Sequence, residues 1–199
     1  MQRKLLNIPG LIASTVIAGS AAAFVSLPLV ASPAFAAEKA VAAEKNPPGD
    51  IPDSQIFITY QSKSGFSLKI PEGWARLDRN DGASFVDKLD GVVVTETADD
   101  AVPTVDSVKK TFIPNLDKQN HAVKLDKVEQ IKLPAGQAIR IAFSSNSEPN
   151  SVTNKQVRLE NEIYIYHDGG KTVSVRFYAP YGADNADQWN LMSRSFRWQ

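Results

Sequence analysis

Strict alternation of apolar and polar residues is the feature that most constrains the fold of this chain. Within the segment 157–166, Ile163 and Ile165 share one parity, whereas Tyr164 and Tyr166 share the other. Because successive side chains of a strand point to opposite faces of a sheet, such alternation predicts strands. The same pattern recurs in three other segments, at 66–70, 139–143 and 173–177.

Short turn sequences separate several of these predicted strands. His167-Asp168-Gly169-Gly170 predicts a tight hairpin, because glycine readily adopts the positive φ that two-residue hairpin turns need. Leu133-Pro134-Ala135-Gly136 predicts a second turn, and the stretch 87–91 predicts a third. Links this short join antiparallel neighbours, since parallel strands need a long crossover connection. We therefore expect an antiparallel sheet.

Two segments have helical spacing instead. The first begins after Thr104, a favourable N-cap residue, and Pro114 should end or kink it. The second begins at Ala183 or Asp184 and ends near Ser195. Several antiparallel strands with one inserted helix and one terminal helix predict an α+β fold whose sheet is covered, at least in part, on both faces.

The N-terminus has the three parts of a secretory signal peptide. A short basic start precedes an uncharged, alanine-rich run, and Ala34-Phe35-Ala36 supplies small residues at the exit. We interpret residues 1–36 as a signal that is cleaved between Ala36 and Ala37. Without a twin-arginine pair, the general secretory pathway is the expected route, to a secreted or extracytoplasmic location. An uncleaved anchor is the alternative, because the run is long enough to span a bilayer.

Residues 37–53 predict a disordered linker, because this stretch is rich in Ala, Glu, Lys and Pro and has few large apolar groups to bury. The remaining residues, 54–199, are numerous enough for one domain with its own core. The predicted organisation is therefore a signal peptide, a flexible tether and a single folded domain.

Composition excludes several classes of function. The chain has 22 Lys and Arg against 22 Asp and Glu, and removal of the predicted signal takes away two of the basic residues. A nucleic-acid-binding surface is not expected from a nearly neutral domain, nor is lasting attachment to an anionic membrane. The absence of cysteine excludes disulfides, thiolate catalysis, Cys-ligated zinc and a lipid attached at the cleavage site.

Two stretches resemble the PsbP-like domains. Residues 65–74, Gly-Phe-Ser-Leu-Lys-Ile-Pro-Glu-Gly-Trp, are similar to their opening strand and Pro-x-Gly-Trp turn, and Tyr178-Ala179-Pro180 with Trp189 and Trp198 is similar to their last strand and terminal helix. The resemblance spans 55–199 and is strongest to short exported actinobacterial members without an assigned activity. It implies an α/β/α sandwich around an antiparallel sheet. Photosynthetic relatives help photosystem II retain calcium and chloride, but none of their binding residues can be carried over to a position here.

No constellation of residues predicts catalysis. The only two histidines, His121 and His167, lie in polar or turn settings without a Gly-x-Ser-x-Gly elbow, and we interpret both as surface residues. Asp78-Arg79-Asn80-Asp81-Gly82 departs from calcium-loop spacing, since Gly is fifth rather than sixth, and predicts a turn. These acids with Glu72 could also form a glycosidase pair, but nothing in the sequence fixes their separation.

Aromatic residues offer one candidate binding surface. If the helices leave part of the second sheet face open, a partner-binding patch would consist of Arg158, Tyr164, Tyr166 and Trp74. The sequence thus favours a monomeric, non-enzymatic accessory domain without cofactors that docks on an unidentified protein of the cell envelope. A binder of a small ligand or of calcium, including a photosystem-type role, is the first alternative. A hydrolase with an unrecognised site is the second.

Overall fold

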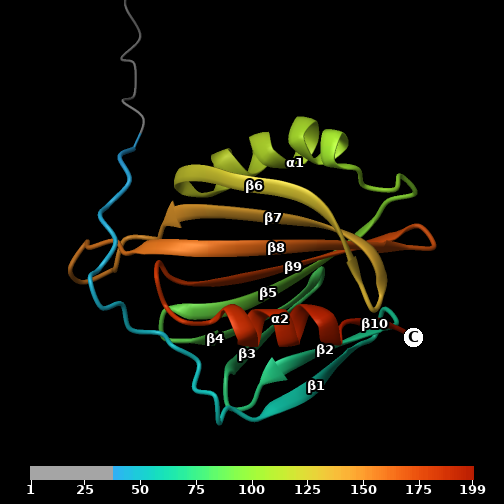
Figure 1. The fold of residues 1–199 in the computed structure, drawn as a ribbon, viewed down its shortest axis with the longest axis horizontal. Helices are drawn as coiled ribbons and strands as arrows, with labels where there is room; N and C mark the ends of the chain where they lie inside the picture. Colours follow the sequence, from blue (N-terminus) through green and yellow to red (C-terminus); the bar gives the residue numbers. More distant parts are fainter. Residues whose placement is uncertain (1–37) are drawn as a thin grey trace, which may run out of the picture. The chain divides into compact units, whose positions relative to one another are not determined.

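The structure is a computed structural model that describes residues 38–199 (Figure 1). Within these residues, no helix combines the length and the apolar character needed to cross a membrane. The predicted signal peptide and its cleavage point between Ala36 and Ala37 lie outside the described residues.

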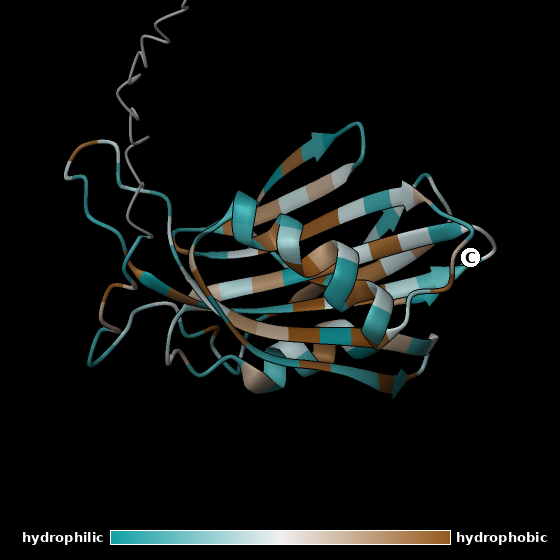
Figure 2. Cartoon of the chain, turned by 90° about the horizontal axis from the view of Figure 1, so that it is seen from above, coloured by the Kyte–Doolittle hydropathy of each residue, from teal (hydrophilic) through white to brown (hydrophobic). Residues whose placement is uncertain are grey.

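A seven-stranded antiparallel sheet forms the centre of the domain. Its strand order is β3-β4-β5-β9-β8-β7-β6, and three of the four alternating segments of the sequence form the neighbouring strands β9, β8 and β7. Bands of hydrophobic and hydrophilic residues follow one another along these strands in Figure 2. The strands are β3 (Ala75–Arg79), β4 (Gly82–Asp87), β5 (Asp90–Ala98), β6 (His121–Leu133), β7 (Gly136–Asn146), β8 (Arg158–Asp168) and β9 (Lys171–Pro180).

The three predicted turns join neighbouring strands of this sheet. Asp168 pairs with Lys171, which leaves Gly169 (φ 53°) and Gly170 (φ 79°) as the two-residue loop between β8 and β9. Both φ values are positive, as a type I′ turn requires. The antiparallel pairing predicted from the short links is confirmed throughout the sheet.

Helix α1 (Val105–Gln119) covers one part of one sheet face. Thr104 caps it through a bond from Ser107 N to Thr104 Oγ1, so the predicted N-cap is confirmed. Pro114 does not end the helix, contrary to one of our expectations, and the helix continues for more than a turn beyond it. Val108 and Leu116 pack against apolar side chains of β7 and β8, and this contact stabilises the helix despite the proline.

A second, three-stranded sheet and helix α2 (Ala186–Ser195) pack against the opposite face. The small sheet has the order β1-β2-β10, with β1 (Phe57–Ser62), β2 (Phe66–Pro71) and β10 (Arg197–Trp198). The α+β class is confirmed. The predicted α/β/α layering is modified, because one face carries a helix together with a sheet, and the second sheet was not predicted from the sequence.

The segment 38–53 is irregular but attached to the domain, which corrects the prediction of a disordered linker in its described part. Ile51 is buried in the core, and its N–H donates to Asn185 Oδ1 (2.6 Å). Asn185 Nδ2 donates in turn to the carbonyl of Gly49 (2.8 Å). Composition had suggested disorder, but one buried isoleucine and a set of backbone hydrogen bonds hold the segment in place.

Candidate functional site

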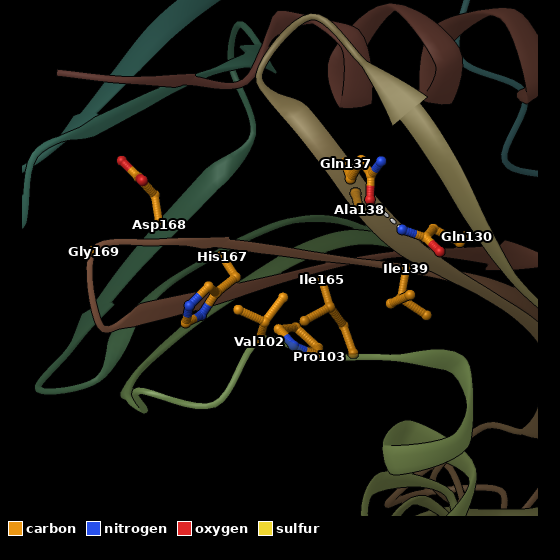
Figure 3. Close-up of a pocket in the computed structure, with 10 residues that line it drawn as sticks. All are labelled: Val102, Pro103, Gln130, Gln137, Ala138, Ile139, Ile165, His167, Asp168 and Gly169. Atoms are coloured by element: carbon orange, nitrogen blue, oxygen red, sulfur yellow. Dashed lines mark hydrogen bonds between the residues drawn. The ribbon is translucent and has the colours of Figure 1, made fainter.

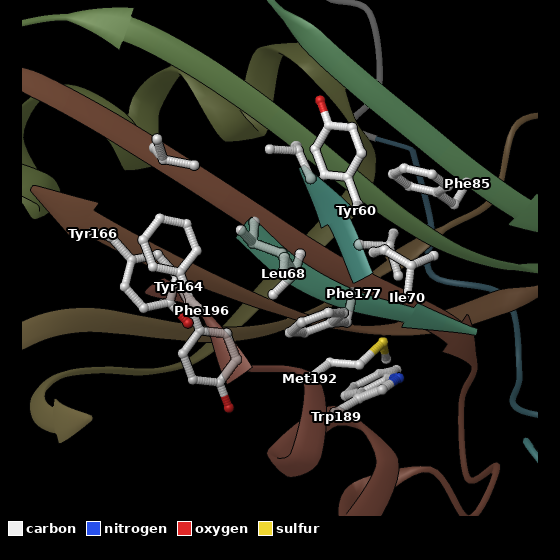
Figure 4. Close-up of a cluster of buried hydrophobic side chains, with 14 of the residues drawn as sticks. Tyr60, Leu68, Ile70, Phe85, Tyr164, Tyr166, Phe177, Trp189, Met192 and Phe196 are labelled. Atoms are coloured by element: carbon white, nitrogen blue, oxygen red, sulfur yellow. The ribbon is translucent and has the colours of Figure 1, made fainter. Parts of the chain in front are cut away.

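The predicted aromatic binding patch is not a surface in the structure. Tyr164 and Tyr166 are 5% and 1% exposed and lie among the core side chains (Figure 4). The ring of Tyr166 stacks on Phe196 with centroids 4.0 Å apart, and its hydroxyl donates to the carbonyl of Ser193 (2.8 Å). Helix α2 and the second sheet cover this face, so the prediction that these tyrosines bind a partner is wrong.

Of the other two patch residues, one is buried and the other is partly buried. Arg158 is 6% exposed, and its guanidinium donates to the carbonyl of Ala122 and to side-chain oxygens of Ser144 and Asn146. Trp74 is partly buried and packs against the core. Arg158 therefore joins three strands internally instead of meeting a partner.

The two histidines lie at different places. His167 lines a cavity of about 370 Å³ near the β8–β9 hairpin, and its Nδ1 lies 3.0 Å from Thr172 Oγ1. Figure 3 shows His167 pointing toward Val102, while Asp168 points away from it. The neighbouring Gln130 and Gln137 bond to each other. Among the described residues, no pair of oppositely charged side chains meets in this cavity. We therefore do not take it as the candidate site.

A larger cavity, of about 620 Å³, lies beside the C-terminal end of α1 and is our candidate site. Its floor is the part of the sheet that α1 leaves uncovered, on strands β5 and β9, and its rim includes the β4–β5 turn and the β7–β8 loop. This loop is internally bonded, because Asn150 Oδ1 accepts from the backbone N–H groups of Val152 and Thr153. The cavity therefore has ordered walls.

Arg176 lies on the floor of this cavity, which we call the Arg176 cavity. Its Nε and Nη2 both donate to Asn161 Oδ1 (2.9 and 2.6 Å), and its Nη1 donates to Asn120 Oδ1 (2.9 Å). No carboxylate among residues 38–199 bonds to it. Burial lowers the pKa of Arg176, because the charged form loses hydration that no anion replaces.

Two aromatic rings hold the guanidinium in its place. Its carbon lies 5.5 Å from the ring centre of Phe143 and 5.4 Å from that of Tyr178, which is cation–π distance. Tyr178 has room only because its cross-strand partner is Gly91, where an added Cβ would lie 2.2 Å from the tyrosine ring. Gly91 thus permits the aromatic wall beside Arg176.

His121 occupies the rim of the same cavity. Its Nδ1 lies 2.6 Å from Glu38 Oε2, and its Nε2 lies 3.2 Å from Glu148 Oε2. These hydrogen bonds, first that of Glu38 and then that of Glu148, raise the pKa of His121. Glu38 also accepts from Gln156 and Asn146, and these bonds lower its pKa. The rim is therefore linked to the start of the described chain.

Metal binding finds no support in the described part of the chain. Across residues 38–199, no three His, Asp or Glu side chains converge as metal ligands. The stretch 78–82 includes the predicted turn between β3 and β4, whose loop is Asn80-Asp81. Asp90 is buried without a partner for Oδ1, and burial, with Asp87 and Asp50 nearby, raises its pKa to about 7.

Sequence reasoning did not identify the Arg176 cavity. Arg176 belongs to a recognised alternating segment, but which face it occupies could not be decided, and its partners lie on β8 and at the end of α1. The available signal was a charged residue within a strand of otherwise apolar and small residues. That signal cannot reveal whether a carboxylate lies opposite.

Comparison with solved structures identifies the fold. Cyanobacterial PsbP (CyanoP) from Synechocystis sp. PCC 6803 matches 76% of this chain and 98% of its own, with a TM-score of 0.54 and 13% sequence identity. The fold is PsbP-like. This outcome confirms the predicted resemblance at the level of the fold, whereas the special similarity to actinobacterial members stays a prediction.

Two further structures are similar to a smaller degree. A Bacteroides thetaiotaomicron protein has a TM-score of 0.46 at 12% identity and covers 68% of this chain and 46% of its own. A Pseudomonas aeruginosa protein of unknown function has a TM-score of 0.44 at 13% identity and covers 70% and 94%. No protein-family model and no curated relative matches the sequence. A PsbP-like fold alone specifies no activity, so function has to be argued from the site.

Proposed function

We propose that this protein is an exported, non-catalytic accessory domain that binds a small ligand in the Arg176 cavity. The observation that carries the proposal is a guanidinium on the floor of a cavity of about 620 Å³, bonded only to amide oxygens. Pockets that bind small molecules combine apolar walls with a few convergent polar groups, and this cavity has both. The proposal takes up the ligand-binding alternative from the sequence.

The surroundings of the cavity support binding rather than turnover. Both ring nitrogens of His121 are engaged by carboxylates, so neither is directed at a nucleophile. The nearby Ser147 Oγ donates to the carbonyl of Glu148 and accepts from the N–H of Val157. A nucleophile paired with a general base is therefore absent from the described lining of the cavity.

Export is part of the proposal and has its own test. Residues 1–36 have the pattern of a signal peptide, and cleavage after Ala36 would leave Glu38 as the second residue of the mature chain. N-terminal sequencing of the protein recovered from outside the cytoplasm should begin at Ala37. A sequence that begins at Met1 or Gln2 would contradict cleavage.

Native mass spectrometry tests ligand binding directly. The mature protein, purified from its own host under native conditions, should carry a small molecule that dissociates on denaturation. Arg176→Met should lose that mass, whereas Arg76→Met, which removes an exposed arginine on β3, should keep it. Absence of any added mass in the wild-type protein, or equal retention by both variants, would contradict the proposal.

Docking on a protein of the cell envelope is the second candidate function. It is favoured by exposed apolar side chains on two strands at sheet edges, Ile58 on β1 and Leu77 on β3, which are 49% and 64% exposed. Ile58→Lys with Leu77→Lys should preserve the fold and remove a specific cross-link formed in intact cells. An unchanged cross-link would contradict docking through these strands.

A further inference from the structure

Arg176 has more donors than its protein partners use. A guanidinium has five N–H groups, and three of those of Arg176 are donated to Asn161 and Asn120. The remaining two have no acceptor among the described residues. Since Arg176 lines the cavity, a ligand there can accept from these two N–H groups.

The charge of Arg176 is also unmatched. Its contacts are two amide oxygens and two aromatic rings, so no negative charge replaces the water lost on burial. The other cations that line the cavity are Lys88 and Lys155. Glu148, the carboxylate of the lining, is engaged by His121. The cavity therefore favours an anion, and a single negative charge would balance Arg176.

The shape of the donor group and the cavity walls narrow the class of anion. A guanidinium is planar, and two of its N–H groups can donate together to the two oxygens of one carboxylate. Apolar side chains adjoin it, so an organic group attached to the carboxylate would also be buried. These apolar lining residues are Leu89, Val93, Val157 and Leu159.

We infer that the Arg176 cavity binds a small organic monocarboxylate whose carboxylate pairs with Arg176 and whose apolar part packs against Leu89, Val93 and Leu159. This inference rests on the proposed ligand-binding function and names the chemical class of the ligand. The carboxylate supplies the counter-charge that the protein itself lacks.

Calorimetric titration of the mature protein with matched acids and amides tests the inference. The probes are hexanoate and benzoate, their uncharged analogues hexanamide and benzamide, and inorganic phosphate. Both acids should bind at least about ten-fold more tightly than their amides, which corresponds to the loss of one charge-assisted pairing. Arg176→Met should abolish this difference, and Arg76→Met should leave it unchanged.

Asn161→Asp is a second variant that does not depend on removing the arginine. Aspartate has the shape of asparagine, can accept the same two bonds from Arg176, and can accept from Ser145 after its hydroxyl turns. This internal carboxylate should raise the thermal midpoint and weaken acid binding at least about ten-fold, because the cation is then already neutralised.

Three outcomes would overturn the inference. Amides that bind as well as acids would show that charge is not recognised, phosphate that binds more tightly would point to another class of anion, and a lack of binding by either acid would exclude monocarboxylates of this size. A ligand that co-purifies with the wild-type protein and is lost in Arg176→Met would still support the proposed function in each case. Failure of both experiments would remove both proposals.

Discussion

The two faces of the seven-stranded sheet come from the same alternating sequence but bury different kinds of groups. On one face, Arg140 bonds to the carboxylates of Glu129 and Glu162, and their bonds raise its pKa. On the other face, Arg176 bonds only to amides, and burial lowers its pKa. An arginine that is matched by carboxylates serves the fold, whereas an unmatched one marks a place where a ligand can complete the structure.

The two faces also differ in how completely other elements cover them. The Arg140 face is closed by α2 and the second sheet, with stacked rings that include Tyr166 and Phe196. On the Arg176 face, α1 packs over β6, β7 and β8 and leaves part of β5 and β9 uncovered, where the Arg176 cavity lies. The closed face supplies stability, and the partly open face supplies the site.

Introducing a charge should change the free energy of unfolding more than any other substitution considered, and the change should differ strongly between the two faces. Tyr166→Asp would bury a carboxylate among aromatic rings and should destabilise the domain by more than about 4 kcal/mol, which is enough to prevent folding. Ser174→Asp, on the neighbouring strand but facing the other way, should cost less than about 1 kcal/mol. Urea unfolding measures both, and similar losses would refute the difference between the faces.

Removing each arginine should have the next largest effect. Arg140→Met leaves Glu162 as a partly buried carboxylate without its cation and should cost about 2–4 kcal/mol. Arg176→Met loses bonds to two amides but also removes an uncompensated buried charge, so its cost should be about 1 kcal/mol or less. Equal costs, measured from the unfolding midpoints at pH 7, would contradict the proposed contrast.

Asp90 is a buried acid whose Oδ1 has no hydrogen-bond partner in the described part of the chain, so it can be compared with the unmatched Arg176. Its pKa of about 7 lies above the usual 3.8, because the folded protein favours the protonated acid. The contribution of this protonated form to folding stability is complete below about pH 4 and is lost as the pH rises through 7. Asp90→Asn should leave stability at pH 4 unchanged and increase it at pH 8 by up to about 4 kcal/mol, which corresponds to the rise of the pKa from 3.8 to about 7.

Unfolding free energies of Asp90→Asn and of the wild-type protein across this pH range provide the measurement. Glu160, whose pKa burial also raises to about 7, should retain part of the pH dependence in the variant. A variant with the same pH profile as the wild-type protein would show that Asp90 is not held protonated.

His121 should have the smallest effect. Because the carboxylates of Glu38 and Glu148 raise its pKa, its contribution is complete below its usual value of 6.5 and is lost as the pH rises through the raised value. His121→Gln should therefore be slightly less stable than the wild-type protein at pH 5.5 and equal to it at pH 9. A difference in stability between the variant and the wild-type protein that grows as the pH rises would contradict this prediction.

The sequence by itself determined the strands, the turns and the class of the fold. Alternation defines a strand locally, and a Gly169-Gly170 turn needs no distant partner, so both are readable along the chain. The same was true of the Thr104 cap. The resemblance of residues 65–74 to PsbP-like domains also rested on a contiguous stretch, and a PsbP-like fold was confirmed, although the α/β/α layering was not.

Only the tertiary structure decided which polar and aromatic groups are exposed. Tyr164 and Tyr166 became core residues because α2 and the second sheet, distant in sequence, cover their face. Ile51 tied down a segment whose composition suggested disorder. The site itself depends on Asn120, Asn161 and Arg176 meeting from three elements. Alternation gives each residue one of two faces, but register and packing determine what lies opposite it.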